Sequence, residues 1–133
     1  MSEVRRISSG GPWEDSYGYS RSVVAGSFVF VSGCTSILDG AIRYEGDPYR
    51  QAKTALENVD AALAQAGVTI TDVVRSRIYL VHARDAEAVG RAHAEVFGAA
   101  RPAATLVIVQ GLIDSRLLVE IEVVAYKDPG SAG

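Results

Sequence analysis

Cysteine and long apolar stretches are almost missing from this sequence of 133 residues. Cys34 is the single cysteine, which excludes an internal disulfide framework and favours a reducing compartment. No apolar run approaches the roughly 18 residues that a membrane-spanning helix requires, and no segment has the pattern of a signal peptide. We therefore expect a cytoplasmic protein with no membrane partner.

Basic residues are also few. Lysine and arginine number 13 against 16 aspartates and glutamates, which gives a formal net charge of −3 and a pI near 5.3. The basic positions are scattered, whereas a protein that binds a phosphate backbone needs a clustered basic surface. We therefore expect no nucleic-acid partner.

Patterns for metals and phosphate-bearing cofactors are missing as well. The two histidines, His82 and His93, lie on different predicted elements, and no ligand spacing surrounds Cys34. Gly10 and Gly11 neither follow a long strand nor precede a capped helix, so they do not form a phosphate-binding loop. We expect no metal and no cofactor, and a packing role for His93.

Apolar residues, by contrast, are abundant. They make up 48% of the sequence, and the mean hydropathy is +0.13. This value is high for a small monomer, so we expect some apolar surface to be buried between subunits. The length fits one domain, 1–133, with a flexible tail at 128–133.

Two helices have clear boundaries. For the first, Asp47 is suited to cap, Pro48 to occupy the first helical position, and Gly67 to end the helix. Its apolar residues recur at helical spacing and form one stripe for a sheet face. The second helix is expected from a cap at Asp85 to Phe97.

Strands are predicted from the alternation of apolar and polar positions. Residues 17–35 read as a hairpin, and 101–126 as a second, central hairpin whose two strands pair directly. A strand at 73–81 is expected to turn Val74, Ser76, Ile78 and Leu80 toward the helices. The first 16 residues read as a short strand and a loop, in which Trp13 either packs on an apolar edge or closes over a ligand. A weak strand is expected at 42–44.

This order of elements predicts an α+β fold with two helices on one face of a single mixed sheet. The opposite face is left uncovered, and it carries a mixture of charged and aromatic side chains: Arg75, Arg77, Tyr79, Glu120 and Glu122. Such a mixture suits a subunit interface with polar pockets better than open solvent.

Four segments carry a family resemblance: GYSRSVVAGSFVFVSGCT, QAKTALENVDAALAQAGV, DVVRSRIYLV, and RPAAT followed by VEIEVVAY. In this order they resemble the RidA/YjgF family, formerly the L-PSP endoribonuclease family, along nearly the whole chain. The resemblance implies a chorismate-mutase-like homotrimer with small-molecule pockets in the clefts between subunits. It also implies hydrolysis of an imine or enamine without a cofactor.

Glu120 is the strongest catalytic candidate. Two carboxylates side by side on one strand face must be paired or must titrate upward. From the residues alone, an ion-pair ladder with Arg75 or Arg77 explains them as well as a functional role does. The resemblance favours function, because the matching glutamate of the family positions and protonates through water.

The resemblance places other residues near the ligand. Tyr19 matches a pocket tyrosine, and Gly33 belongs to a Ser-Gly pair beside the ligand. Cys34 stands where glutamine is common, and it is either a small buried hydrophobe or a reactive thiol at a strand end. Leu106 stands where many members have a cysteine that acts mainly through its backbone.

Ala104 departs from the family pattern. The arginine that members carry at this position grips the substrate carboxylate in a two-pronged hydrogen-bonded pair. Arg21 is the best candidate to replace it, because it shares a strand face with Tyr19; a plain surface role explains Arg21 equally well. Arg101 is a poorer candidate.

The sequence therefore predicts a hydrolase or deaminase for a small imine or enamine, with altered specificity. A non-catalytic trimer that binds a small metabolite is the alternative. Ribonuclease activity finds little support in the acidic charge balance.

Overall fold

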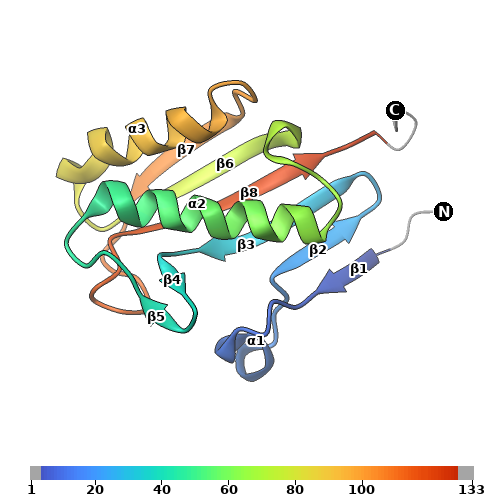
Figure 1. The fold of residues 1–133 in the computed structure, drawn as a ribbon, viewed down its shortest axis with the longest axis horizontal. Helices are drawn as coiled ribbons and strands as arrows, with labels where there is room; N and C mark the ends of the chain where they lie inside the picture. The colour runs from blue at the N-terminus through green and yellow to red at the C-terminus, as the bar shows by residue number, and fades with distance from the viewer. Residues whose placement is uncertain (1–3, 129–133) are drawn as a thin grey trace.

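The computed structural model describes residues 4–128, which form a mixed sheet with two long helices on one face (Figure 1). Residues 129–133 of the expected tail lie outside the described residues. Within the described part the sheet has six strands, in the order β1-β2-β3-β8-β6-β7. These are β1 Val4–Ile7, β2 Ser22–Ala25, β3 Phe28–Cys34, β6 Val73–Leu80, β7 Ala103–Ile108 and β8 Val119–Tyr126.

The remaining elements are short or helical. The long helices are α2 Pro48–Gln65 and α3 Ala86–Phe97. The others are helix α1 Pro12–Tyr17, the two-stranded hairpin β4 Ile37–Leu38 and β5 Ala41–Ile42, and the 3₁₀ turns η1 Ile70–Asp72 and η2 Ala83–Asp85. The α+β class and the mixed sheet are confirmed.

The helices arise from the signals that predicted them. The Asp47 carboxylate accepts a hydrogen bond from the Arg50 N–H at 3.0 Å, with Pro48 in the first turn. Gly67 adopts a φ of +85° after the helix, a conformation that glycine accepts without strain. The apolar stripe of α2 is buried, and it forms the core together with α3 and the covered sheet face.

The predicted hairpin at 101–126 is wrong. Strand β7 pairs in parallel with β6, and β8 pairs antiparallel with the other edge of β6, so β6 lies between them. The crossover through α3 returns the chain parallel to β6, as βαβ units do. Residues 109–118 then pass the end of β6, where the Val109 N–H donates to the Leu80 carbonyl at 2.7 Å.

Strand β6 also differs from its predicted face pattern. The pairing with β8 shifts register between Val73 and Arg75, which is a β-bulge. Val73 is consequently buried, and Val74 is 45% exposed instead of facing the helices. Ser76, Ile78 and Leu80 face the helices as predicted.

The N-terminal segment contains helix α1, which the sequence analysis assigned to a loop. The buried Glu14 carboxylate accepts hydrogen bonds from the N–H groups of Ser9 and Gly11, both at 3.2 Å, and from the Ser9 hydroxyl. Helix α1 ends at Gly18, whose φ is +78°. The weak strand at 42–44 is instead the β4–β5 hairpin, because Tyr44 has a φ of +58° and lies outside it.

The uncovered face of the sheet is present. Phe28, Phe30 and Tyr126 are 43%, 46% and 41% exposed on it, and the rings of Phe28 and Tyr126 lie 5.1 Å apart across β3 and β8. Farther along the same face, Arg77 lies opposite Glu122 and Tyr79 opposite Glu120. None of the described helices is long and apolar enough to span a membrane.

Candidate functional site

A cavity of about 900 Å³ opens at the end of β3. Figure 1 shows α1 and the β4–β5 hairpin flanking this strand end. Polar groups from α1, β3, α2 and β8 line the cavity together with aromatic and aliphatic side chains. The residues that line the cavity include Trp13, Tyr17, Tyr19, Arg21, Gly33, Cys34, Ile37, Leu38, Asp39, Asn58, Gln65, Ile113 and Glu120.

Gly33 allows the Glu120 carboxylate to reach this cavity. Strand β3 continues past its last partner on β2, and its register with β8 shifts between Val31 and Cys34. A Cβ atom built on Gly33 would lie 2.7 Å from the carboxyl carbon of Glu120, which is closer than two carbons approach. The absence of a side chain at position 33 therefore sets the place of the carboxylate.

The Glu120 carboxylate has no hydrogen-bond or ion-pair partner among residues 4–128, and it is partly buried. The ion-pair ladder considered from the sequence, across strands or between subunits, is not formed across the strands of one chain among residues 4–128. Arg75 instead donates to the Thr105 hydroxyl at 2.9 Å, and Glu122 accepts a hydrogen bond from Tyr79. Burial raises the pKa of Glu120, Arg21 acts in the opposite direction, and Glu122 raises it further, with a net increase.

Arg21 is held inside the cavity wall. Its Nη1 donates to the carbonyls of Gly33 at 2.8 Å and Ser32 at 3.2 Å, and it lies 3.3 Å from the Cys34 sulfur. Its Nε lies 4.0 Å from the Glu14 carboxylate, and its side chain is 15% exposed. Arg21 is therefore not a surface residue, and its Nη1 is already engaged by the chain itself.

Glu14 is the site-building residue that the sequence analysis missed. Burial acts to raise the pKa of Glu14, but hydrogen bonds from Ser9, Ser8 and Gly11 together hold it below its usual value. The charged carboxylate thus stands behind the Arg21 guanidinium. A proline followed by a glutamate two residues later is a helix N-terminus signature that was available in the sequence.

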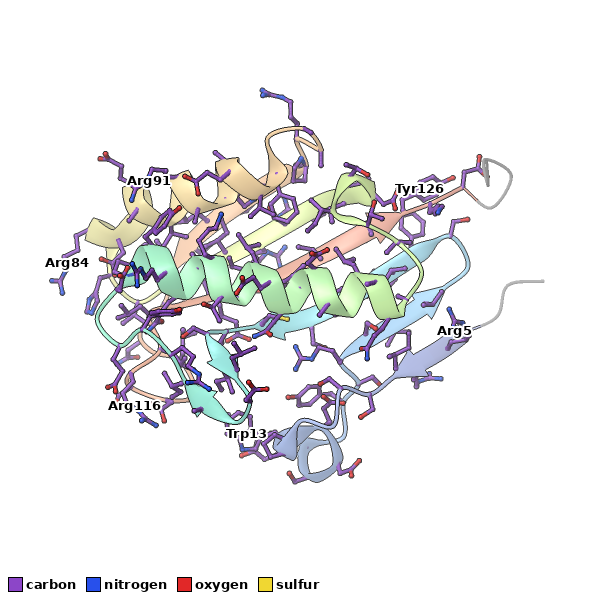
Figure 2. The ribbon with its side chains drawn as sticks, in the orientation of Figure 1. Arg5, Trp13, Arg84, Arg91, Arg116 and Tyr126 are labelled. Carbon is purple, nitrogen blue, oxygen red and sulfur yellow. The ribbon has the colours of Figure 1, made fainter. Side chains whose placement is uncertain are left out.

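Aromatic side chains form one wall. The Arg21 guanidinium lies 5.7 Å from the centre of the Tyr19 ring, and its Nη2 is 3.5 Å from the Tyr19 hydroxyl. Figure 2 shows Trp13 on the side of α1 that faces the β4–β5 hairpin, where it lines the cavity.

Cys34 is buried, with 5% of its surface exposed. Burial raises the pKa of its thiol, Arg21 opposes this increase, and Glu120 adds to it, with a net increase. A neutral thiol in this position agrees with a small buried hydrophobe, whereas a reactive cysteine requires a thiolate.

Ala104 and Leu106 do not join the other site residues within one chain. They lie on the edge strand β7 in register with Ser76 and Ile78, whose side chains face the helices, whereas Glu120 is in register with Tyr79 on the uncovered face. Neither residue lines the cavity. Of the site residues predicted from the sequence, one chain thus brings together Tyr19, Arg21, Gly33, Cys34 and Glu120 at the cavity, but not Ala104 or Leu106.

The histidines lie away from the cavity lining. The Nε2 atom of His93 is 2.8 Å from the buried Ser76 hydroxyl, and its ring packs on Phe97. Burial lowers the pKa of His93. Among residues 4–128, no group of three or more histidine, cysteine or acidic side chains is placed to hold a metal ion.

Glu120→Gln is expected to stabilise the protein at neutral pH. A carboxyl whose pKa is raised on folding stabilises the folded state fully below its ordinary pKa, near 4.5 here, and loses this contribution as the pH rises through the folded value. The gain in the variant's melting temperature should be largest at pH 7–8 and shrink toward pH 4.5. Glu57→Gln, which removes an exposed carboxylate of α2, should show no such trend, and a destabilised Glu120→Gln at pH 7 would contradict the assigned environment.

Gly33→Ala should displace the Glu120 carboxylate without unfolding the chain, because the atoms in the way are the far end of a flexible side chain. We expect ligand affinity or activity to fall about as far as in Glu120→Gln while the melting temperature changes little. Gly111→Ala is the matched control, since a Cβ there meets nothing within 4 Å. Full function in Gly33→Ala would show that the carboxylate position is not important.

Comparison with known proteins identifies the family. The family model for endoribonuclease L-PSP matches residues 14–127. An uncharacterised protein of Streptomyces coelicolor is 50% identical over 93% of this chain and 92% of its own length. A RutC family protein of Pyrococcus horikoshii is 37% identical over 83% of this chain and 87% of its own.

A solved structure agrees with these matches. A member of the YjgF/YER057c/UK114 family from Mycobacterium tuberculosis superimposes with a TM-score of 0.85 at 42% identity, covering 94% of this chain and all 100% of its own. The match in sequence and fold extends over the elements that build the cavity. The chain therefore belongs to the endoribonuclease L-PSP family, also called the RidA/YjgF family.

Proposed function

We propose that this protein hydrolyses the C–N bond of a small imine or enamine, with Glu120 as the catalytic residue and without a cofactor. The observation that carries the proposal is the Glu120 carboxylate, which faces a cavity, lacks a partner among the described residues and has a raised pKa. The upward shift moves the pKa of this carboxyl toward neutral pH, and general acids and bases work best when their pKa lies near the operating pH.

The proposed reaction needs one proton-transfer group and water. Protonated Glu120 gives its proton to the imine nitrogen, and water adds to the carbon of the resulting iminium. The carboxylate accepts the proton that this water releases and returns it to the nitrogen of the carbinolamine. Ammonia or an amine then leaves as the hydroxyl oxygen forms the carbonyl, and Glu120 takes up the hydroxyl proton and is protonated again, so water is the only co-reactant.

Assembly completes the proposed site. The uncovered sheet face and the unpaired edge of β7 are surfaces that a second copy of the chain can cover. In a homotrimer with clefts between subunits, as the family resemblance implies, the β7 edge of one copy meets the cavity of the next. Ala104 and Leu106 then contribute to a site that they do not reach within one chain.

Substrate choice is proposed to differ from that of members with an arginine at the position of Ala104. Hydrogen bonds from a charged group contribute roughly 1.5–3 kcal/mol each, so the loss of a two-pronged grip weakens carboxylate binding by orders of magnitude. Arg21 supplies no equivalent two-pronged grip, because its Nη1 donates to the Ser32 and Gly33 carbonyls and leaves only Nη2, beside the Tyr19 hydroxyl, for a ligand. We assign Arg21 to positioning the strand end instead.

Ribonuclease activity is a weaker candidate. The charged side chains that line the cavity are Arg21, Asp39 and Glu120, so carboxylates outnumber cations. A phosphate backbone would meet repulsion there.

The wild-type protein should hydrolyse 2-iminopropionate, generated in situ from an amino acid, weakly or not at all. Ala104→Arg should gain measurable hydrolysis, and adding Glu120→Gln to that variant should remove about 10²–10⁴-fold of the rate, the usual contribution of a general acid or base. Glu57→Gln is the control for loss of charge, because Glu57 is an exposed carboxylate of α2 that does not line the cavity.

Two results would count against this account. Wild-type turnover as fast as that of Ala104→Arg would refute the argument from the missing arginine. If Ala104→Arg gains no activity and Glu120→Gln changes neither turnover nor ligand binding, a non-catalytic trimer that binds a metabolite explains the cavity better.

The assembly is expected to be a stable trimer. Sedimentation should show one species near three times 14.1 kDa, and Phe28→Glu, which places a charge in the middle of the exposed aromatic cluster, should dissociate it. Ala64→Glu, at an exposed position of α2 on the other side of the sheet, serves as the control. A wild-type monomer at micromolar concentration would remove the basis for a cleft between subunits.

A further inference from the structure

We infer that the cavity selects a cationic nitrogen attached to an apolar or aromatic body without a carboxylate, so that the substrate is the iminium of a simple amine rather than of an amino acid. For the reaction itself this inference rests on the proposed function. The selectivity for charge, however, is a property of binding that can be measured without turnover.

The cavity lining carries more negative than positive charge. Two carboxylates, Asp39 and Glu120, face one cation, Arg21. The Arg21 side chain is only 15% exposed, and its guanidinium is directed to two backbone carbonyls and to the buried Glu14 carboxylate. An anionic ligand would therefore meet an arginine whose Nη1 is already engaged, and it would be repelled by the Glu120 carboxylate, which has no partner among the described residues.

A second copy of the chain would bring no cation to the cavity through strand β7. Strand β7, Ala103–Ile108, has the sequence AATLVI and carries no charge. If the edge of this strand reaches the cavity of a second copy, it brings methyl groups and backbone but no cation. The unpaired Glu120 carboxylate is then the dominant charge that a ligand meets.

The walls of the cavity contain aromatic and aliphatic side chains. Trp13, Tyr17 and Tyr19 present aromatic rings to the cavity, and the Tyr19 ring already accommodates the Arg21 guanidinium at 5.7 Å from its centre. Aromatic faces attract cations through the negative charge of the ring face. Ile37, Leu38 and Ile113 add aliphatic surface for the body of the ligand.

The negative charge of the cavity also favours the hydrolysis of an iminium. Water attacks an iminium more readily than a neutral imine, because the positive nitrogen withdraws electrons from the carbon. A carboxylate beside that nitrogen keeps it protonated, as an opposite charge favours the charged form of its neighbour. A carboxylate on the substrate would oppose the pairing of the iminium nitrogen with the Glu120 carboxylate.

The test uses three ligands with the same aromatic body and different head groups: 2-phenylethylamine, 2-phenylethanol and 3-phenylpropanoate. At pH 8 the amine should bind about tenfold or more tightly than the carboxylate, the magnitude expected from one charge-assisted hydrogen bond. Glu120→Gln should reduce this preference about tenfold or more, whereas Glu57→Gln, which removes an exposed carboxylate outside the cavity, should leave it unchanged. Calorimetry or ligand-observed NMR gives both affinities.

Acidification supplies a second readout. The amine keeps its charge below pH 8, so weaker binding as the pH falls reports protonation of Glu120. The other charged or titratable groups that line the cavity are Tyr17, Tyr19, Arg21, Cys34 and Asp39, and Asp39→Asn separates the two carboxylates. The acid-induced loss should persist in Asp39→Asn and be absent in Glu120→Gln.

Equal or tighter binding of 3-phenylpropanoate overturns the inference, and so does failure of all three ligands to bind at millimolar concentration. Neither result bears on whether Ala104→Arg hydrolyses 2-iminopropionate. A failure of the selectivity inference is therefore distinguishable from a failure of the proposed function.

Discussion

The contact between the Gly33 backbone and the Glu120 carboxylate is the constraint on which the site depends. A glutamate near the start of a strand in the sheet interior would ordinarily pair with a cation on a neighbouring strand, and Arg77 is only one row away. Gly33 lies within the register shift of β3. Because Gly33 has no side chain, the Glu120 carboxylate has room next to the β3 backbone. The result is a partly buried acid that faces a cavity with no partner among the described residues.

A second set of contacts maintains this strand end. Arg21 donates to the carbonyls of Ser32 and Gly33, which are not paired in the sheet ladder, and Glu14 stands behind its guanidinium. Unpaired carbonyls next to a carboxylate would be unfavourable, and the arginine stabilises both. Helix α1 is therefore part of the site, although Glu14 itself does not line the cavity.

Much of the fold could be predicted from the sequence because its signals are local. Asp47, Pro48 and Gly67 mark the ends of α2, and the alternation in β8 places Glu120 and Glu122 together on the uncovered face. The pairing of β7 could not be read in this way, because the strand is apolar on both faces and its partner depends on the crossover through α3.

Other differences have equally physical causes. A single bulge reverses the side on which Val74 lies, and α1 has only six residues, too few for a periodic pattern. The role of Arg21 depends on α1 and on the β3 carbonyls together, so neither segment predicts it alone. The residues that determine the site are thus those whose conformations are set by tertiary contacts, as is usual for functional sites.

The most direct test of this account is an NMR titration of the Glu120 side-chain carboxyl carbon in the wild type and in Arg21→Gln. The account predicts a wild-type pKa above the usual value of a glutamate, because burial and Glu122 outweigh the attraction of Arg21. Removing the guanidinium should raise the pKa further. A wild-type pKa at or below the usual value, or a decrease in Arg21→Gln, would contradict the claim that Glu120 is an unpaired acid available for proton transfer.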